Sequence, residues 1–437
     1  MKRILALSMS LTLTVALLSG CGKATTKTTT PNTTSSEDPI TLTMLVSGTK
    51  AASGEDFVLD TLPKMVKESF PNITLETTKL PDDQYNTSIK TKLVAGEGPD
   101  IFMVWPKTGV CGAIDLGKAG YLMDLSGMKF WDNFAKGAVD DMSYDGKPVA
   151  VASGLDLLGV YYNKALFTKV GITSEPKDWN SFLDACAKLK AAGITPITMG
   201  DKDPWVVQFG LYQIAANVVY PGDMDFDKKL QAGTESLSNP KWVKALSMYK
   251  ELYDKGYVVK NSLGVASAQA LQTYVDGKAA MIFDGTWDYN AVTAKGASEF
   301  ERGFMPLPAN ESGKPTFVSA STASGYAVNS KTKNADAVKK VLELMYDGKS
   351  TLFESWRDAN TSVSVFKGVP LKNELNKGIF DLYTTGGNSV YFSNQMWPSG
   401  VADVMQSKFA EVIGGQKTSA EDVAKAMDSK FKELWKN

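Results

Sequence analysis

Tryptophan and aspartate side chains recur directly after short apolar segments of this sequence. Trp105, Trp205 and Trp287 each follow such a segment, and Asp203 and Asp284 lie within three residues of two of them. An aromatic ring offers roughly 150–250 Å² of rigid apolar surface, and an ionised carboxylate accepts strong hydrogen bonds from hydroxyl groups. Together these side chains predict binding of a ligand with an apolar face and a hydroxyl rim, as a sugar ring has.

Each of these residues also has a purely structural interpretation. Any one tryptophan could pack in the core of a domain, and any one aspartate could be a solvated carboxylate. Asp284 precedes the helix expected near Trp287, so it could also cap the N-terminus of that helix. Trp is uncommon, with nine in the chain, and its recurrence after predicted strands favours a ligand site.

The segments before these residues are typical of strands. Strands are expected at residues 40–44, 73–77, 101–104, 159–162, 195–199 and 279–283. Helices are expected at 57–70, 84–95, 179–192, 204–219, 240–255, 265–276, 335–345, 400–413 and 419–435. Alternating strands and helices predict an α/β fold with largely parallel sheets, in which ligands bind beyond the carboxyl ends of strands. Ser47, after the first strand, joins the candidate site for this reason.

Residue counts exclude several kinds of chemistry. The chain has no histidine, which removes serine–histidine and cysteine–histidine nucleophilic sites and zinc sites that need histidine. We expect no catalytic residue, no metal and no cofactor. Glycoside hydrolysis by two carboxylates stays open as an alternative, but the adjacent pairs Asp82-Asp83 and Asp140-Asp141 lie away from the predicted site. An ATPase is also not favoured. Gly348-Lys349-Ser350 resembles the end of a P-loop, but Glu343 stands where that motif has its first glycine.

Composition indicates a two-domain globular protein without a nucleic-acid partner. From about Pro39, roughly 400 residues remain, which suits two domains. The formal net charge is −1, and removal of Lys2 and Arg3 with a signal peptide would make it −3. A nucleic-acid-binding surface would be basic instead.

The N-terminus is typical of a secreted lipoprotein. Residues 1–21 combine a basic start, an apolar run too short for a membrane span and the sequence Leu18-Ser19-Gly20-Cys21. This resembles a lipobox, so Cys21 is predicted to carry the lipid, including palmitate. Residues 22–38 are rich in Thr and Ser without a large apolar side chain, which predicts a disordered linker.

Several motifs together resemble the family 1 extracellular solute-binding proteins, the sugar-binding lipoproteins of ABC transporters that are similar to maltose-binding protein. The resemblance covers nearly all of residues 39–437. The motifs are Tyr161-Tyr162-Asn163-Lys164-Ala165-Leu166-Phe167, Ala192-Gly193-Ile194-Thr195-Pro196, Gly277-Lys278-Ala279-Ala280-Met281 with Gly285-Thr286-Trp287, Gly325-Tyr326-Ala327-Val328, and Gly414-Gly415-Gln416-Lys417-Thr418-Ser419.

This resemblance implies a two-lobed type 2 periplasmic-binding-protein fold with a ligand cleft between the lobes. By analogy, lobe one would comprise residues 39–152 and 311–350, and lobe two residues 153–310 and 351–437. Trp287 matches an aromatic residue that stacks on sugar rings in relatives, and Trp205 follows a loop that reaches the cleft. Trp397 lies near another cleft aromatic, and Asp156 would face the cleft at a crossover between the lobes.

The resemblance further implies a function. The chain is expected to be a monomeric, lipid-anchored binding protein on the extracellular face of a bacterial membrane, delivering a sugar or oligosaccharide to ABC-transporter permease subunits. It would not be an enzyme. A binding protein for a peptide, polyamine or phosphate ester is the closest alternative. A phosphate ligand would favour arginine, and Arg302 and Arg357 are the only arginines after Arg3.

Overall fold

The computed structural model describes residues 38–48, 55–294, 298–360, 363–369, 374–385 and 387–435. Cys21, the signal peptide and almost all of the predicted linker lie outside these described residues. Within them, no helix is both long enough and apolar enough to cross a lipid bilayer.

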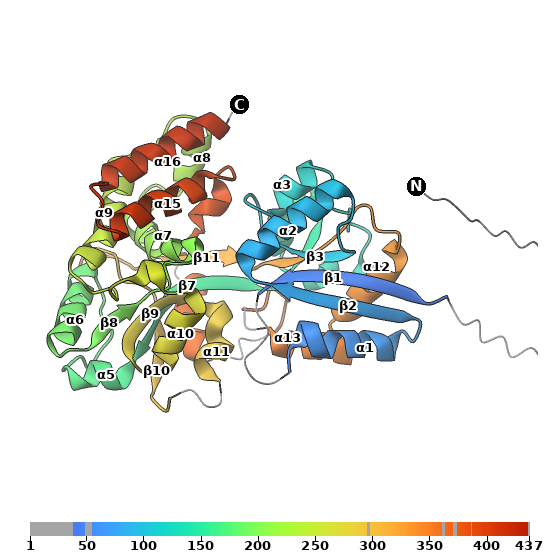
Figure 1. Cartoon of the computed structure of the whole chain (residues 1–437), viewed down its shortest axis with the longest axis horizontal. Helices are drawn as coiled ribbons and strands as arrows, with labels where there is room; N and C mark the ends of the chain where they lie inside the picture. Colours follow the sequence, from blue (N-terminus) through green and yellow to red (C-terminus); the bar gives the residue numbers. More distant parts are fainter. Residues whose placement is uncertain are drawn as a thin grey trace, which may run out of the picture. The chain divides into compact units, whose positions relative to one another are not determined.

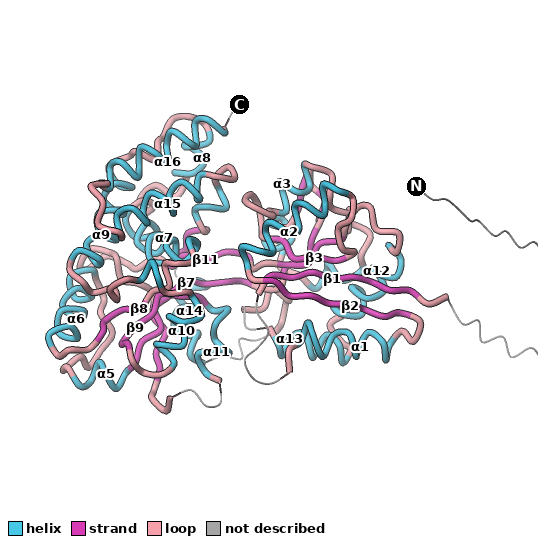
Figure 2. The backbone as a smooth tube through the Cα atoms, in the orientation of Figure 1, coloured by secondary structure: helices cyan, strands magenta, loops and turns pink. Residues whose placement is uncertain are grey.

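The first sheet has five strands in the order β2-β1-β3-β12-β6 (Figures 1 and 2). Its strands are β1 (Ile40–Ser47), β2 (Ile73–Leu80), β3 (Ile101–Val104), β6 (Ala150–Ala152) and β12 (Gly325–Val328). Strands β1, β2 and β3 are parallel, as the alternation of strands and helices predicts. Strand β12 is inserted between β3 and β6 and runs antiparallel to both.

The second sheet has the order β13-β11-β7-β9-β8, with β10 also paired to β7. Its strands are β7 (Leu155–Asn163), β8 (Thr195–Thr198), β9 (Ala279–Gly285), β10 (Arg302–Met305), β11 (Val318–Thr322) and β13 (Ser389–Tyr391). Strand β8 is parallel to β9, whereas β7 is antiparallel to β9, β10 and β11. The expected largely parallel order is therefore wrong for this sheet, because β7 is paired with three strands that all run antiparallel to it. A two-stranded ribbon, β4 (Ser143–Tyr144) and β5 (Lys147–Pro148), lies apart from both sheets.

Helices cover both sheets. Around the first sheet, α1 and α2 lie on opposite faces (Figure 1). Around the second sheet, α7, α9, α15 and α16 pack together on one side (Figure 1). The α-helices are α1 (Leu62–Ser69), α2 (Asp82–Ala95), α3 (Ala113–Lys118), α4 (Lys136–Asp141), α5 (Lys164–Lys169), α6 (Trp179–Ala191), α7 (Val207–Val218), α8 (Phe226–Gln231), α9 (Pro240–Asp254), α10 (Ser267–Val275), α11 (Tyr289–Thr293), α12 (Ala335–Met345), α13 (Thr351–Ala359), α14 (Lys377–Thr385), α15 (Val401–Ile413) and α16 (Ala420–Leu434).

Local sequence signals set where several helices begin. The Asp178 side chain accepts from the backbone N–H of Ser181 and forms a capping box at the start of α6. Ser419 and Asp422 form the same arrangement at the start of α16. These caps explain why the predicted starts of both helices agree closely with the structure.

Each sheet organises its own hydrophobic core, and we refer to each sheet with its core as a lobe. The core of lobe one contains buried residues between 42 and 152 and between 327 and 366. The main core of lobe two contains residues between 158 and 309 and between 390 and 431. The predicted lobe-one segment 311–350 includes β11, which belongs to the second sheet, and ends before Leu352 and Trp356, which pack in the core of lobe one.

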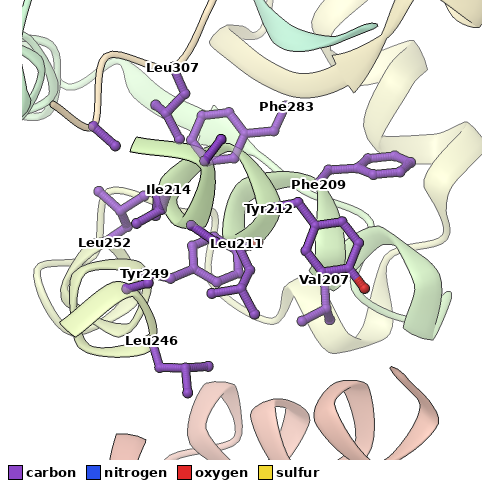
Figure 3. Packing of buried hydrophobic residues seen from close by; sticks show 14 of the residues in the cluster. Val207, Phe209, Leu211, Tyr212, Ile214, Leu246, Tyr249, Leu252, Phe283 and Leu307 are labelled. Carbon is purple, nitrogen blue, oxygen red and sulfur yellow. The ribbon is translucent and has the colours of Figure 1, made fainter. Parts of the chain in front are cut away.

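Both faces of the second sheet are buried. Side chains of β9 alternate, so that Met281 and Phe283 join the main core while Ile282 joins a smaller core on the opposite face. Helix α7 supplies much of the main core, including Phe209, Tyr212 and Ile214 (Figure 3). A Cβ atom built on Gly210 of this helix would lie 2.9 Å from the Phe283 ring. This packing places the end of β9 beside the start of α7.

Candidate functional site

Two of the predicted tryptophans lie at the same end of the second sheet, beyond the carboxyl ends of two strands. Strands β8 and β9 are parallel neighbours, so the residues after both strands lie at the same end of the sheet. Trp205 follows β8 on the 3₁₀ turn η3 (Pro204–Val206), and Trp287 follows β9 on the turn η5 (Thr286–Asp288). The positions inferred from the strand pattern are therefore spatial neighbours.

A third ring completes a row of aromatic side chains. Phe209 lies between the two tryptophans, with ring centroids 5.4 Å from Trp205 and 5.1 Å from Trp287. Trp205 and Trp287 are half-buried and rest against the main core of lobe two, whereas Phe209 is buried. The row thus has a fixed inner member and two outer rings with accessible surface, the arrangement that a stacking platform needs.

Trp287 is held by two carboxyl groups. Its indole hydrogen-bonds to both Asp284 and Asp288, and these two carboxyls also hydrogen-bond to each other. Asp284 accepts a further bond of 2.8 Å from the backbone N–H of Gly285. Burial, and then the charge of Asp288, raise the pKa of Asp284 well above its ordinary value. The pair therefore retains a shared proton at a higher pH than an exposed aspartate would.

Asp284 itself does not face the surface. Its side chain is buried at 3% exposure, and its oxygens are engaged by Gly285, Asp288 and Trp287. Asp284 is therefore not expected to contact the ligand directly, contrary to the prediction from sequence. Helix capping is not its role either, since the residue preceding η5 is Gly285.

Two other predicted aspartates lie beside the aromatic row. Asp203 precedes η3 and accepts a bond of 2.7 Å from the backbone N–H of Ser267. Asp156, on β7, lies 3.5 Å from the hydroxyl of Thr286, the neighbour of Trp287. Both side chains are only half-buried, so their carboxylates border the platform.

The first sheet contributes polar residues from its own carboxyl edge. Ser47, the last residue of β1, donates a hydrogen bond to Asp82, which follows β2 at the start of α2. Trp105, after β3, packs edge-on against Tyr85 of α2 with centroids 5.9 Å apart. Since β1, β2 and β3 are parallel, these residues share one end of the sheet.

The charge of Asp82, in lobe one, interacts with the charges of two aspartates in lobe two, Asp203 and Asp288. Burial raises the pKa of Asp82, and the charges of Asp203 and Asp83 raise it further. Burial raises the pKa of Asp288, and the charge of Asp82 raises it further. Carboxylates of both lobes therefore act on one another next to the aromatic row. The sequence-based interpretation missed Asp82 and Asp288, although the strand-end rule that selected Ser47 would also have found Asp82, two residues after β2.

A second group of contacts joins the lobes near β13. The Lys107 ammonium lies 2.9 Å from Asp141 and 4.6 Å from the centre of the Tyr391 ring. Asp141 also accepts a bond of 2.6 Å from the Thr322 hydroxyl. Thus Asp141, which was expected to lie away from the site, contacts residues of lobe two. Lys107 has a φ of 55°, a region that a non-glycine residue rarely occupies.

Trp397 is a core residue. It has no exposed surface and packs edge-on against Trp242 and Tyr212, at centroid distances of 5.5 and 6.1 Å. Its indole nitrogen is buried and has no hydrogen-bond partner among the described residues. The prediction that Trp397 contacts ligand is therefore corrected, because a ring enclosed on all sides offers no stacking face.

The loop before Trp205 contains a buried carboxyl whose ionisation should make stability depend on pH. Burial raises the pKa of Asp201 to about 6 from an ordinary value of 3.8, although Tyr253 donates it a hydrogen bond of 3.1 Å. The folded protein therefore holds this proton more tightly than the unfolded chain does. Between pH 4 and 6 this group makes stability fall as pH rises, by up to about 3 kcal/mol, with little further change above pH 6.

The Asp201→Asn variant tests this prediction. Relative to the wild-type protein, its free energy of unfolding should rise by up to about 3 kcal/mol from pH 4 to pH 7, as measured by urea denaturation. Asp132→Asn, at an exposed position, serves as the control. A constant difference between Asp201→Asn and wild type across this pH range would contradict the prediction.

Two surface hollows lie away from the predicted residues. One of about 680 Å³ is open and follows α2, where it is lined by Asp83, Gln84, Thr87, Ser88, Thr91, Lys92, Ala95 and Glu97. Another of about 390 Å³ lies between α8 and α16. None of the predicted ligand residues lines either hollow. In the part of the chain that the structure describes, no group of three or more Cys, Asp or Glu side chains could hold a metal ion.

Comparison with known proteins agrees with this architecture. A family model for bacterial extracellular solute-binding proteins matches residues 58–349, about two thirds of the chain. A multiple sugar-binding protein of Streptococcus mutans is 25% identical over 320 residues, which cover 71% of this chain and 73% of that protein.

Solved structures share the fold over most of the chain. A chitin oligosaccharide binding protein has a TM-score of 0.78 and 24% sequence identity, covering 91% of this chain and 100% of that one. A sugar transporter protein of Bacillus licheniformis in complex with stachyose has a TM-score of 0.72 and 17% identity, covering 90% and 100%. The two-lobed α/β fold predicted from the sequence is thereby confirmed.

Proposed function

The chain belongs to the bacterial extracellular solute-binding protein family, and from this premise we propose that it binds a sugar or short oligosaccharide between its two lobes and delivers it to an ABC-transporter permease. The family consists of binding proteins of ABC transporters, not enzymes, and its members act outside the cytoplasm. The resemblance stated from sequence motifs is thus confirmed at the level of the family.

The row formed by Trp205, Phe209 and Trp287 is the observation that carries this proposal. Its two outer rings offer apolar faces on which the C–H side of a sugar ring can stack. Asp203 and Asp156 border these rings. Asp82 lies on the other lobe, and its charge interacts with that of Asp203. The oxygens of these carboxylates can accept hydrogen bonds from sugar hydroxyls. The ligands named for two structural relatives, a chitin oligosaccharide and stachyose, are consistent with this chemistry.

The arginines give little support to an anionic ligand. The guanidinium of Arg302 donates to the backbone carbonyls of Phe300 and Ser298, and that of Arg357 pairs with Asp358. The charges beside the aromatic row are carboxylates instead. This arrangement argues against a phosphate ester as the ligand, whereas a peptide or polyamine remains the alternative for the experiment to decide.

Titration calorimetry of the purified protein against neutral oligosaccharides, a peptide mixture and a polyamine tests the proposal. We expect saturable binding of at least one oligosaccharide, and chromatography of the recovered ligand should show it uncleaved. Binding of the peptide or polyamine in place of every sugar would overturn the sugar assignment. Cleavage of a bound sugar would instead support the hydrolase alternative.

We further propose that the protein is a monomer attached to the extracellular face of the membrane through lipid on Cys21. The lipobox-like sequence before Cys21 and the Thr-rich stretch of residues 22–38 support this proposal. Replacement of Cys21 by Ala should move the protein from the membrane fraction to the culture medium, as followed by immunoblotting of both fractions. Cys186→Ala is the matched control, since that buried cysteine lies in α6. Retention of the Cys21→Ala protein in the membrane fraction would rule out this anchor.

A further inference from the structure

The Trp287 ring lies directly against the backbone of Gly285. A Cβ atom built on Gly285 would lie within 2.5 Å of three ring carbons, Cζ3, Cη2 and Cε3. Gly285 has an extended backbone with φ of −127° and ψ of 178°, which any residue can adopt. The absence of a side chain at this position is therefore required by the neighbouring ring and not by backbone conformation.

The turn beneath the ring is fixed by strand β7. The Tyr161 hydroxyl donates a bond of 3.1 Å to the carbonyl of Gly285. The backbone N–H of Leu157 donates a bond of 3.2 Å to the hydroxyl of Thr286, whose side chain is fully buried. Because the backbone is held from below, an added Cβ at Gly285 would displace the indole, which is only half-buried, before it displaced the turn.

The other side of the indole is held by hydrogen bonds. Its N–H group is engaged by the Asp284–Asp288 pair, and its ring leans on Phe209 at an interplanar angle of 50°. Backbone contact, carboxyl pair and aromatic neighbour therefore restrain the ring from three directions. A tryptophan on a short turn would otherwise sample several rotamers and lose entropy when it stacks on a ligand.

We propose that Gly285 and the Asp284–Asp288 pair are positioning residues that hold Trp287 in its stacking orientation, so that they set affinity without contacting the ligand. This inference rests on the proposed function, because stacking on a sugar is the property that the orientation serves. It also gives Asp284 a role that fits its burial.

A double-mutant cycle tests the role of Gly285. Gly285→Ala should weaken binding of the oligosaccharide identified by calorimetry by about fivefold or more, since it should remove much of what Trp287 contributes. In a Trp287→Ala background, the same substitution should change affinity by less than about twofold, because there is no longer an indole to displace. About twofold is also the precision to which the effects of independent substitutions add. An equal loss in both backgrounds would overturn the proposal. Gly264→Ala is the control, because a Cβ there meets no atom within 4 Å.

A conservative pair of variants tests the carboxyl group in case Gly285→Ala fails to fold. Asp288→Asn keeps an acceptor for the indole N–H and should bind within about twofold of wild type. Asp288→Leu removes the acceptor, so it should lose affinity when Trp287 is present but not in the Trp287→Ala variant. Equal losses for Asn and Leu would show that the charge acts directly on the ligand.

Fluorine NMR separates this inference from the sugar assignment. In protein labelled with 5-fluorotryptophan, the Trp287 resonance is the one missing from a Trp287→Phe variant. Gly285→Ala and Asp288→Leu should shift or broaden that resonance without any ligand, and Gly264→Ala should not. An unmoved resonance would overturn the positioning role. Failure of every sugar to bind, with the resonance shifted, would overturn the proposed function alone.

Discussion

Replacement of Trp397 by Ala is expected to lower the free energy of unfolding by about 3–5 kcal/mol, the usual cost of removing a large buried aromatic ring. The ring is fully enclosed between Trp242 and Tyr212, so its loss would leave a cavity. The indole nitrogen has no hydrogen-bond partner among the described residues, so the expected loss comes from packing alone. Urea denaturation of the variant at pH 7 measures this effect.

The opposite result would restore the role first inferred from sequence. If Trp397→Ala unfolds at the same urea concentration as wild type yet binds oligosaccharide much more weakly, Trp397 belongs to the ligand site. Trp397→Phe is the matched control, because it keeps an aromatic ring in the cavity and should lose far less stability. Affinity of the folded Trp397→Ala fraction should stay within about twofold of wild type, as expected for an independent position.

Replacement of Trp287 or Trp205 by Ala is expected to weaken sugar binding by roughly five- to hundred-and-fiftyfold. Each ring would contribute on the order of 1–3 kcal/mol by burying apolar surface against the ligand, at 1.4 kcal/mol per factor of ten. Because both rings are only half-buried, the variants should keep most of their stability. Calorimetry gives the affinity and thermal melting gives the stability of the same samples.

The rings belong to the core instead if both variants melt at much lower temperature and still bind normally while folded. Trp435→Ala provides a control, since Trp435 is also half-buried but stacks on Phe431 at the end of α16. Its affinity for sugar should not change. A loss in Trp435→Ala equal to that in Trp287→Ala would mean that the affinity changes reflect general damage to lobe two.

The strand-end rule predicted that Trp205 and Trp287 lie close together, because it depends on local sequence and on one pairing. Trp205 and Trp287 came together since β8 and β9 are parallel neighbours. The same rule also indicates Asp82, two residues after β2, although the pair Asp82-Asp83 was expected to lie away from the site. For Trp397 the rule did not apply, and only the packing of Trp242 and Tyr212 around it reveals its burial.

Pairings between distant segments limited the prediction of the fold. Most of the longer helices and strands follow from periodicity, capping residues and turn residues. The direction of β7 and the membership of β11 depend instead on partners far along the chain. No pattern within either strand specifies those partners, so the lobe borders inferred by analogy stay predictions.

The insertion of β12 between β3 and β6 has a consequence for how the chain is made. Gly325 lies opposite Val104 on one side and opposite Ala152 on the other, so the first sheet lacks a central strand until late in synthesis. At typical ribosomal rates of about 5–20 residues per second, that interval is on the order of 10–35 s. Non-local pairing of this kind also slows folding itself. A protein that acts outside the cytoplasm must cross a membrane first, and this topology delays completion of its N-terminal lobe while the export machinery can still thread the unfolded chain.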